Sequence, residues 1–454
     1  MIAFLAFVFP LALYLGFPST LWNFDGVACA AALELGRPSY FFHANHLIYG
    51  FLGFLFWNWI GLPTGLSRAL PALQLFNSLL ACFGVLGLYH LLLSVLKDKW
   101  SAFLLSSALA FTAAFWVWSI EAQVYPLGFL ALAWATYVLV HRQSPYKYIE
   151  VGILHGAAVL GHLMHLLWAI PALYWICEEC RIIHLSLPKA VRQYLLSLGL
   201  LTAVPYLLVI TFVIAPGRDL AHVLIWLKGS AGLTRDRSWA WHSAGWSGPW
   251  VWFKSTAPAL WGSFWPYGNT SVTSWMWILT IISAALFLTV LIRGLTQRSE
   301  RLARFSWLWL GVYGLFLSTW EPPVLCYRLP DVLPLGILLA LGLRSWRSSI
   351  QIFLASLFLG STLALNLLSL IVPMHQSERN QVYQDTLTLS RISNPDSLYI
   401  SEGGLSWIYL LYFTGRKAWN ARVFEPQQLA EEISLQKRRR PVYVQEGAAW
   451  HRVQ

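Results

Sequence analysis

Apolar residues recur along this chain in runs long enough to cross a lipid bilayer, separated by short polar loops. A bilayer-spanning helix needs about 20 predominantly apolar residues. The pattern predicts helices near 2–18, 69–96, 100–118, 123–140, 148–161, 163–178, 193–214, 273–292, 305–319, 329–343 and 350–371. We therefore expect an all-α polytopic membrane domain over residues 1–372, with outer loops at 19–68 and 215–272.

Composition supports the membrane class and excludes an ordinary soluble protein. Hydrophobic residues make up 57% of the chain and charged residues only 11%, whereas charged residues account for about 25% of a typical soluble domain. The net charge of +11 does not indicate a nucleic-acid partner, because many basic residues fall in short loops that can share one side of a membrane. We expect contact with membrane lipids and none with nucleic acid.

The basic loops also decide the topology, because Lys and Arg concentrate in cytoplasmic loops. The segment His46 to Leu62 is as apolar as the predicted spans, and counting it as a crossing would invert everything after it. We expect it to be only partly inserted, although full crossing stays open. The sequence then predicts eleven crossings of the inner (plasma) membrane, a retained first helix with a cytoplasmic N-terminus, and an extracytoplasmic C-terminus. The loops that decide this contain Lys97, Lys99, Arg142, Lys147, Arg181, Lys189, Arg192, Arg293, Arg298, Arg301, Arg304, Arg344 and Arg347.

Residues 373–454 have a different character, since charged residues are about twice as frequent there as in the preceding chain. Short β-prone runs alternate with helical patterns. We predict strands near 397–401, 422–425 and 442–445, and helices at 405–414 and 426–437. The result is a small extracytoplasmic α/β domain.

Charged and imidazole side chains gather at the predicted outer boundary of the membrane. Ionisable residues at such positions in a chain so poor in charge usually mark a pathway, a counter-ion or a reaction centre. The candidates are Asp25, Glu121, Arg328, His43, His46, His162 and His165, with Arg235 and Arg237 in the long outer loop. Plainer alternatives are a hydrated acid for Asp25, a helix cap or ion pair for Glu121, an interfacial anchor for Arg328, and packing for the histidines.

Several short stretches occur in the order found in a known family. They are Asp25-Gly26, His43-Ala44-Asn45-His46-Leu47-Ile48-Tyr49, Arg68-Ala69-Leu70-Pro71-Ala72, Glu121-Ala122-Gln123-Val124-Tyr125-Pro126-Leu127 and Tyr327-Arg328-Leu329-Pro330. Over residues 1 to about 345 the chain resembles GT-C glycosyltransferases, in particular the bacterial protein-mannosyltransferase-like and aminoarabinose-transferase-like branch. The C-terminal α/β domain is similar to the outer domain that such proteins often carry.

The resemblance implies an enzyme that transfers a hexosyl or pentosyl group from a polyprenyl-phosphate-linked donor on the outer face, with inversion. By position, Asp25 matches the first-loop catalytic acid and would act as general base, Glu121 matches the second-loop acid, and Arg328 matches a late phosphate contact. We expect the histidines, Arg235 and Arg237 to bind substrate. The sugar, the acceptor (protein, glycan or lipid) and the oligomeric state stay open.

The chain departs from the family pattern in its first loop. The family often has two adjacent acids there, but Gly26 follows Asp25, and the next acid is Glu34, for which we expect a solvated position. No DxD pair is present, so we predict no required cofactor and leave a divalent metal open. A transporter or lipid flippase and a noncatalytic membrane scaffold remain as alternatives.

Overall fold

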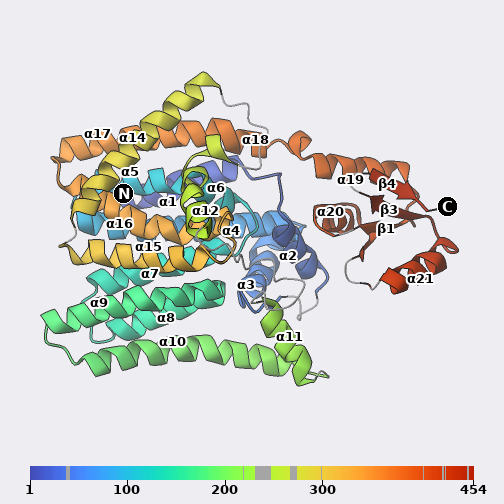
Figure 1. The fold of residues 1–454 in the computed structure, drawn as a ribbon, viewed down its shortest axis with the longest axis horizontal. Coiled ribbons are helices and arrows are strands. Elements are labelled where there is room, and N and C mark those ends of the chain that lie inside the picture. Colours follow the sequence, from blue (N-terminus) through green and yellow to red (C-terminus); the bar gives the residue numbers. More distant parts are fainter. Residues whose placement is uncertain are drawn as a thin grey trace.

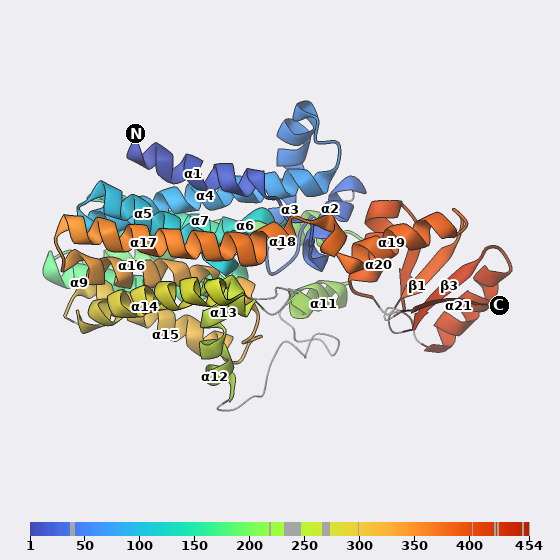
Figure 2. The ribbon, with the colours of Figure 1, turned by 90° about the horizontal axis from the view of Figure 1, so that it is seen from above.

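The computed structural model describes residues 1–454 except 37–40, 218, 231–246, 266–272, 298, 402, 422–423, 425, 447–448 and 454. The described chain is elongated, with a large helical bundle at one end and a small α/β domain at the other (Figure 1). Helices α2 and α3 lie between the two in both ribbon views (Figures 1 and 2). The loop between α1 and α4 therefore occupies the junction of bundle and domain.

The helices of the bundle and its loops follow the apolar pattern closely. They are α1 (Ile2–Gly16), α2 (Phe24–Glu34), α3 (Tyr49–Phe56), α4 (Ala69–Leu96), α5 (Lys99–Ala110), α6 (Ala113–Ile120), α7 (Tyr125–His141), α8 (Lys147–Gly161), α9 (Ala169–Ile182), α10 (Leu187–Val209), α11 (Leu220–Ser230), α12 (Ser247–Lys254), α13 (Thr256–Leu260), α14 (Ser274–Thr296), α15 (Arg301–Leu317), α16 (Val332–Arg344), α17 (Ser348–Asn366) and α18 (Val372–Met374). Two 3₁₀ segments matter below, η4 (Leu163–Trp168) and η8 (Leu325–Asp331).

Length and composition of the helices test the predicted spans in part. Among the described residues, five helices are long and apolar enough to cross a membrane, or six if one bent pair is a single span. The bent pair is α5 and α6, which meet at 71°, so the predicted continuous helix 100–118 is wrong. The number of eleven crossings stays a prediction.

The helices of the bundle approach one another closely where glycine replaces a larger residue. A Cβ added at Gly294 of α14 would lie 2.0 Å from the backbone oxygen of Leu338 in α16. One added at Gly342 of α16 would lie 2.1 Å from that of Val290 in α14. Small residues allow such backbone contact in membrane helices, where van der Waals packing drives association. Helix α4 packs against α1, α5, α7 and α16, and most of its residues are buried.

The C-terminal domain contains a four-stranded sheet with the order β2-β1-β3-β4. Its elements are α19 (Gln381–Ile392), β1 (Leu398–Ser401), α20 (Leu405–Thr414), β2 (Lys417–Asn420), α21 (Pro426–Lys437), β3 (Val442–Glu446) and β4 (Ala449–Arg452). Strand β1 pairs in parallel with β2 and β3, and β4 is antiparallel to β3. Both predicted helices are confirmed. The strand predicted at 422–425 falls largely on residues outside those described, and β2 precedes it.

Candidate active site

Asp25 lies in the first turn of α2, and its side chain is exposed. The helix begins after Asn23, whose side-chain oxygen accepts a hydrogen bond from the Gly26 backbone N–H at 2.9 Å. This cap satisfies one of the free amide groups that begin a helix. The positive end of the helix dipole favours an acidic side chain in the first turn, and Asp25 occupies that position.

Gly26 allows α2 to lie directly against the turn that carries Glu121. A Cβ at position 26 would be 2.6 Å from the backbone oxygen of Ala122 and 3.1 Å from its Cβ. No larger side chain fits there without moving one of the two segments. The departure from the family's pair of acids thus has a physical reason: the second position faces backbone and leaves no space for a carboxylate.

Glu121 is buried, with 2% of its surface exposed, and it ends α6. Its Oε2 accepts a hydrogen bond from Asn23 Nδ2 at 2.9 Å, so one asparagine both caps the Asp25 helix and contacts the second acid. Burial raises the pKa of Glu121 to about 7, although hydrogen bonds from Ser19 and Asn23 act in the opposite direction. No ion pair to Glu121 is present among the described residues.

Amide side chains on α4 hold the Glu121 turn in place, and the sequence analysis missed them. Asn77 Nδ2 donates to the backbone oxygen of Glu121 at 2.6 Å and also to that of Gln123. Gln74 Nε2 donates to Ser19 O at 2.8 Å and to Ile120 O at 3.1 Å. Two amides one helical turn apart in an otherwise apolar span were the available signal, because buried polar groups in such spans require partners.

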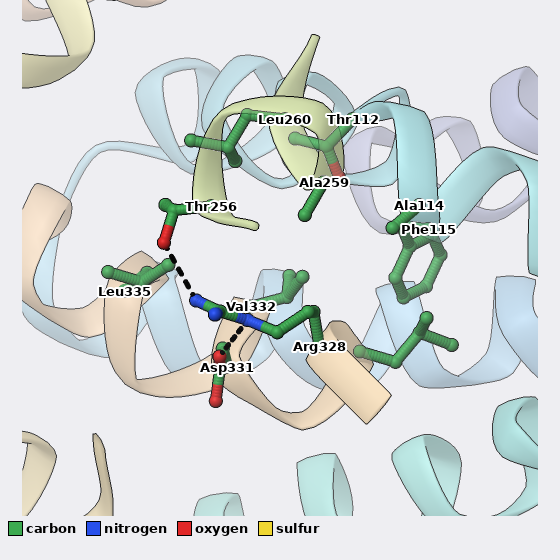
Figure 3. A pocket seen from close by; sticks show the side chains of 11 residues that line it. Thr112, Ala114, Phe115, Thr256, Ala259, Leu260, Arg328, Asp331, Val332 and Leu335 are labelled. Carbon is green, nitrogen blue, oxygen red and sulfur yellow. Dashed lines mark hydrogen bonds and ion pairs between the residues drawn. The ribbon is translucent and has the colours of Figure 1, made fainter. Parts of the chain in front are cut away.

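Arg328 is buried and is held by protein partners. Its Nε lies 2.7 Å from Asp331 Oδ2, and the side chains of both residues are at most 5% exposed. The guanidinium also donates to Ser255 Oγ at 2.9 Å and to Thr256 Oγ1 at 3.0 Å, as Figure 3 shows for Thr256 and Asp331. Its Cζ lies 4.4 Å from the ring centroid of Trp252. Arg328 therefore joins η8 to α12 and α13, and its phosphate-binding role stays a prediction.

Arg328 and Glu121 lie toward opposite ends of α6. The cavity around Arg328 is lined by Thr112, Ala114 and Phe115, from the start of α6 (Figure 3), whereas Glu121 follows the end of that eight-residue helix. At 1.5 Å per residue the helix separates them by roughly 10 Å. Asn23, two residues before Asp25, binds Glu121, whereas Arg328 lies toward the other end of α6; a shared cavity for the three groups stays a prediction.

Glu321 and Tyr327 occupy the side nearer Asp25, and neither was a candidate. Glu321 is buried, with 8% exposed, and has a left-handed backbone at φ 41°. Burial raises the pKa of Glu321, the charge of Asp25 raises it further, and a hydrogen bond with Tyr327 lowers it. A positive φ at a residue other than glycine is uncommon and often occurs at functional sites.

Three of the predicted histidines join this neighbourhood. The rings of His43 and His46 stack with centroids 4.3 Å apart. His162 stacks on Tyr125 with centroids 5.6 Å apart and meets Tyr327 edge-on at 5.9 Å. Burial lowers the pKa of His162 to about 3, and the charge of His43 adds to this. His162 is therefore a neutral aromatic wall at physiological pH, with His43 beside it.

The remaining candidates divide into one packing residue and two that lie outside the described residues. His165 is 1% exposed, its Nδ1 lies 3.2 Å from Tyr313 Oη, and a Cβ at Gly128 would touch its ring. This is the packing alternative, so His165 has no exposed face for a ligand. Arg235 and Arg237 fall within 231–246, outside the described residues.

Glu34 differs from its predicted solvated position. Its carboxylate pairs with Arg68 at 3.0 Å and accepts hydrogen bonds from Ala69 N and Tyr412 Oη, both at 2.8 Å. It therefore connects α2 to α4 and to the C-terminal domain. Within the described part of the chain, no group of three or more His, Cys, Asp or Glu side chains could hold a metal ion.

Comparison with known proteins identifies the class of fold. The structure is similar to the crystal structure of ArnT from Cupriavidus metallidurans bound to undecaprenyl phosphate, with a TM-score of 0.64 and 11% identity over 97% of this chain and 92% of that chain. The apo state of the same ArnT gives a TM-score of 0.60 at 11% identity, over 96% and 90% of the two chains. No family model matches the chain, and no curated protein matches it in sequence.

A second kind of glycosyltransferase shares the architecture. The archaeal oligosaccharyltransferase AglB from Archaeoglobus fulgidus, solved with an inhibitory peptide and a dolichol-phosphate, gives a TM-score of 0.50 at 12% identity, over 97% of this chain and 69% of that chain. This chain thus has the fold of GT-C membrane glycosyltransferases, and the resemblance found in the sequence is confirmed at the level of fold.

Proposed function

We propose that this protein is an integral membrane glycosyltransferase that moves a sugar from a polyprenyl-phosphate-linked donor to a hydroxyl-bearing acceptor. The observation that carries the proposal is the pairing of an exposed Asp25 at a helix N-terminus with a buried Glu121, joined through Asn23. The fold gives the setting, since similar structures hold undecaprenyl phosphate and a dolichol-phosphate.

The chemistry requires a base close to the acceptor. An acceptor oxygen attacks the anomeric carbon, the bond from that carbon to the phosphate oxygen breaks, and polyprenyl phosphate leaves. Asp25 takes the hydroxyl proton as the acceptor oxygen attacks. This direct displacement inverts the configuration at the anomeric carbon in a single step. A positioned general base contributes roughly 100-fold to 10,000-fold to such a reaction.

Glu121 has a different part in the proposal because it is buried and has a high proton affinity. A carboxyl group whose pKa is about 7 is only about half ionised near neutral pH, so it carries less negative charge than an ordinary glutamate. It holds Asn23, which caps the Asp25 helix. The aromatic wall of Tyr125, His162 and Tyr327 would then face the sugar, since ring faces suit apolar sugar surfaces.

The proposal includes the predicted topology and sites. Residues 1–372 would form the membrane domain with eleven crossings and a cytoplasmic N-terminus, and residues 373–454 would lie outside the inner membrane. The exposed apolar side chains of Trp59, Ile60 and Leu62 suit a segment lying at the interface. Arg235 and Arg237 would contact the donor phosphate, as would Arg328 if its partners release it.

The test uses purified protein in liposomes that contain polyprenyl phosphates carrying different radiolabelled sugars. Release of free polyprenyl phosphate, with label appearing on an acceptor, supports the proposal. Asp25→Asn is the variant to compare with the native protein, because it keeps the side-chain shape and removes the base. Label transfer at the native rate by this variant would overturn the assignment of Asp25. Movement of the intact donor across the bilayer without bond cleavage would indicate a flippase.

A further inference from the structure

The short segment Pro18–Asn23 leads into the Asp25 helix and lies between the bundle and the C-terminal residues 373–454. The backbone oxygens of every second residue in this segment face those C-terminal residues. Pro18 O lies 2.9 Å from His375 Nδ1, Thr20 O accepts from Asn380 Nδ2 at 2.8 Å, and Trp22 O accepts from Tyr409 Oη. The intervening oxygen of Ser19 accepts from Gln74 Nε2 of α4 at 2.8 Å. The segment is thus held from two sides.

Aromatic packing reinforces these hydrogen bonds. The Trp22 ring has its centroid 4.6 Å from that of Phe413 and 5.1 Å from that of Tyr383. Tyr409 and Asn380 are 1% and 5% exposed and bind each other at 3.1 Å. Buried hydrogen bonds of this kind are costly to break, because the released partner stays unsatisfied.

We infer that the C-terminal domain sets the geometry of the active site, and that Tyr409 and Asn380 are positioning residues for Asp25 and Glu121. The path is short: Trp22 O binds Tyr409, and the next residue, Asn23, caps the Asp25 helix and binds Glu121. The inference rests on the proposed function for its catalytic half. Its structural half, that the domain immobilises Pro18–Asn23, can be tested without any activity.

Two variants remove the contacts while keeping the local fold. Tyr409→Phe retains the ring that packs near Trp22 and loses only the hydroxyl. Asn380→Asp keeps the side-chain oxygen that caps α19 by accepting from Tyr383 N and loses the Nδ2 donor to Thr20. Matched controls in the same domain are Tyr443→Phe, whose ring stacks on Tyr399, and the exposed Asn394→Ala.

The first measurement is hydrogen–deuterium exchange on the full-length protein in detergent or nanodiscs. We expect Tyr409→Phe and Asn380→Asp to speed exchange at least tenfold across residues 18–26, with the controls unchanged. Native exchange in that peptide for both variants would overturn the inference. This result does not depend on the reaction that the enzyme catalyses.

The second measurement is the kinetics of sugar transfer. A misplaced catalytic group costs up to roughly 100-fold in rate, so we expect kcat to fall 10- to 100-fold while the KM for the donor stays within about twofold. If the domain had only a stabilising role, the two variants would lower the melting temperature and leave kcat unchanged. That outcome would also overturn the inference. Absence of transfer by the native protein would instead refute the proposed function, and the exchange data would still decide whether the domain immobilises the segment.

Discussion

The acid turn around Asp25 and Glu121 and the ion pair of Arg328 with Asp331 are two charged regions of the molecule, and they are built in opposite ways. Arg328 has protein partners on all sides of its guanidinium, including an acid 2.7 Å away. The Glu121 carboxyl is held by the Asn23 amide, with no ion pair to Glu121 among the described residues. A cation and an acid neutralise each other in the first region, whereas burial raises the proton affinity of Glu121 in the second.

This difference corresponds to two roles, a structural one for the ion pair of Arg328 with Asp331 and a chemical one for the acid turn. A buried ion pair contributes little net stability but is costly to break, which suits a junction between η8 and the outer-loop helices. An exposed carboxylate in the first turn of a helix is accessible to an acceptor hydroxyl for a proton transfer. The following changes test that division, from the largest expected effect to the smallest.

Asp25→Asn should lower turnover by roughly 100-fold to 10,000-fold, because it removes the proposed base. Its melting temperature should stay near that of the native protein, since the side chain is exposed. Initial rates of sugar transfer, together with a thermal unfolding curve in detergent, measure both. Loss of folding with this substitution would show that Asp25 has a structural role like that of Asp331.

Arg328→Ala should destabilise the protein by about 3–5 kcal/mol, because it leaves the buried Asp331 carboxylate without its partner. Replacing both residues, as in Arg328→Met with Asp331→Leu, should recover most of that loss. Arg344→Ala is the control, since its pair with Glu300 is exposed and should be worth about 0–1 kcal/mol. A double variant that is stable but has lost donor binding would instead support the phosphate-binding prediction for Arg328.

Glu121 should make stability fall as the pH rises. The folded protein binds this proton with a pKa of about 7, against an ordinary value of 4.5, so the folded state holds more protons between these values. Stability is then greatest below pH 4.5 and decreases by on the order of 3 kcal/mol up to pH 7 before levelling. Glu121→Gln should flatten this interval in unfolding curves recorded at several pH values. An unchanged slope would place the titration elsewhere.

Gly26→Ala should cost about 1–3 kcal/mol and reduce turnover, because its Cβ would push α2 away from Ala122. Gly360→Ala in α17 is the matched control, since a Cβ there meets nothing within 4 Å. That change should be neutral or stabilise by up to about 1 kcal/mol. Equal behaviour of the two variants in melting and transfer assays would mean that α2 can move without affecting the site.

The apolar pattern predicts the helix ends that depend on local sequence alone. Helix α4 begins and ends at the predicted residues 69 and 96, because one uninterrupted apolar run determines both ends. The bend between α5 and α6 was missed, since it depends on distant partners. Tyr14 Oη donates to Ala110 O at 2.8 Å and Asn366 Nδ2 donates to Phe111 O at 2.7 Å, which satisfies carbonyls that a straight helix would have used.

The candidate site was predictable to a similar extent. Asp25 and Glu121 stood out because carboxylates are rare in this chain, and Asn23, two residues before Asp25, binds Glu121; their joint catalytic role stays a prediction. The environment of Arg328 was not foreseen, because Ser255 and Thr256 precede it by more than 70 positions. Tyr327 stood in one of the stretches of the resemblance but was not singled out as a site residue, Glu321 lacked a pattern that would mark it, and only tertiary packing brings Glu321 near Asp25.

The 71° bend between α5 and α6 also sets the electrical surroundings of Glu121. Because α6 turns off the α5 axis and stops after eight residues, its carbonyl end, the negative pole of the helix, lies at Glu121, the residue that caps it. Negative potential there disfavours loss of the proton. Any motion that straightened the two helices would displace Glu121 and change its proton affinity at the same time, so mechanical and acid–base changes at this site are coupled.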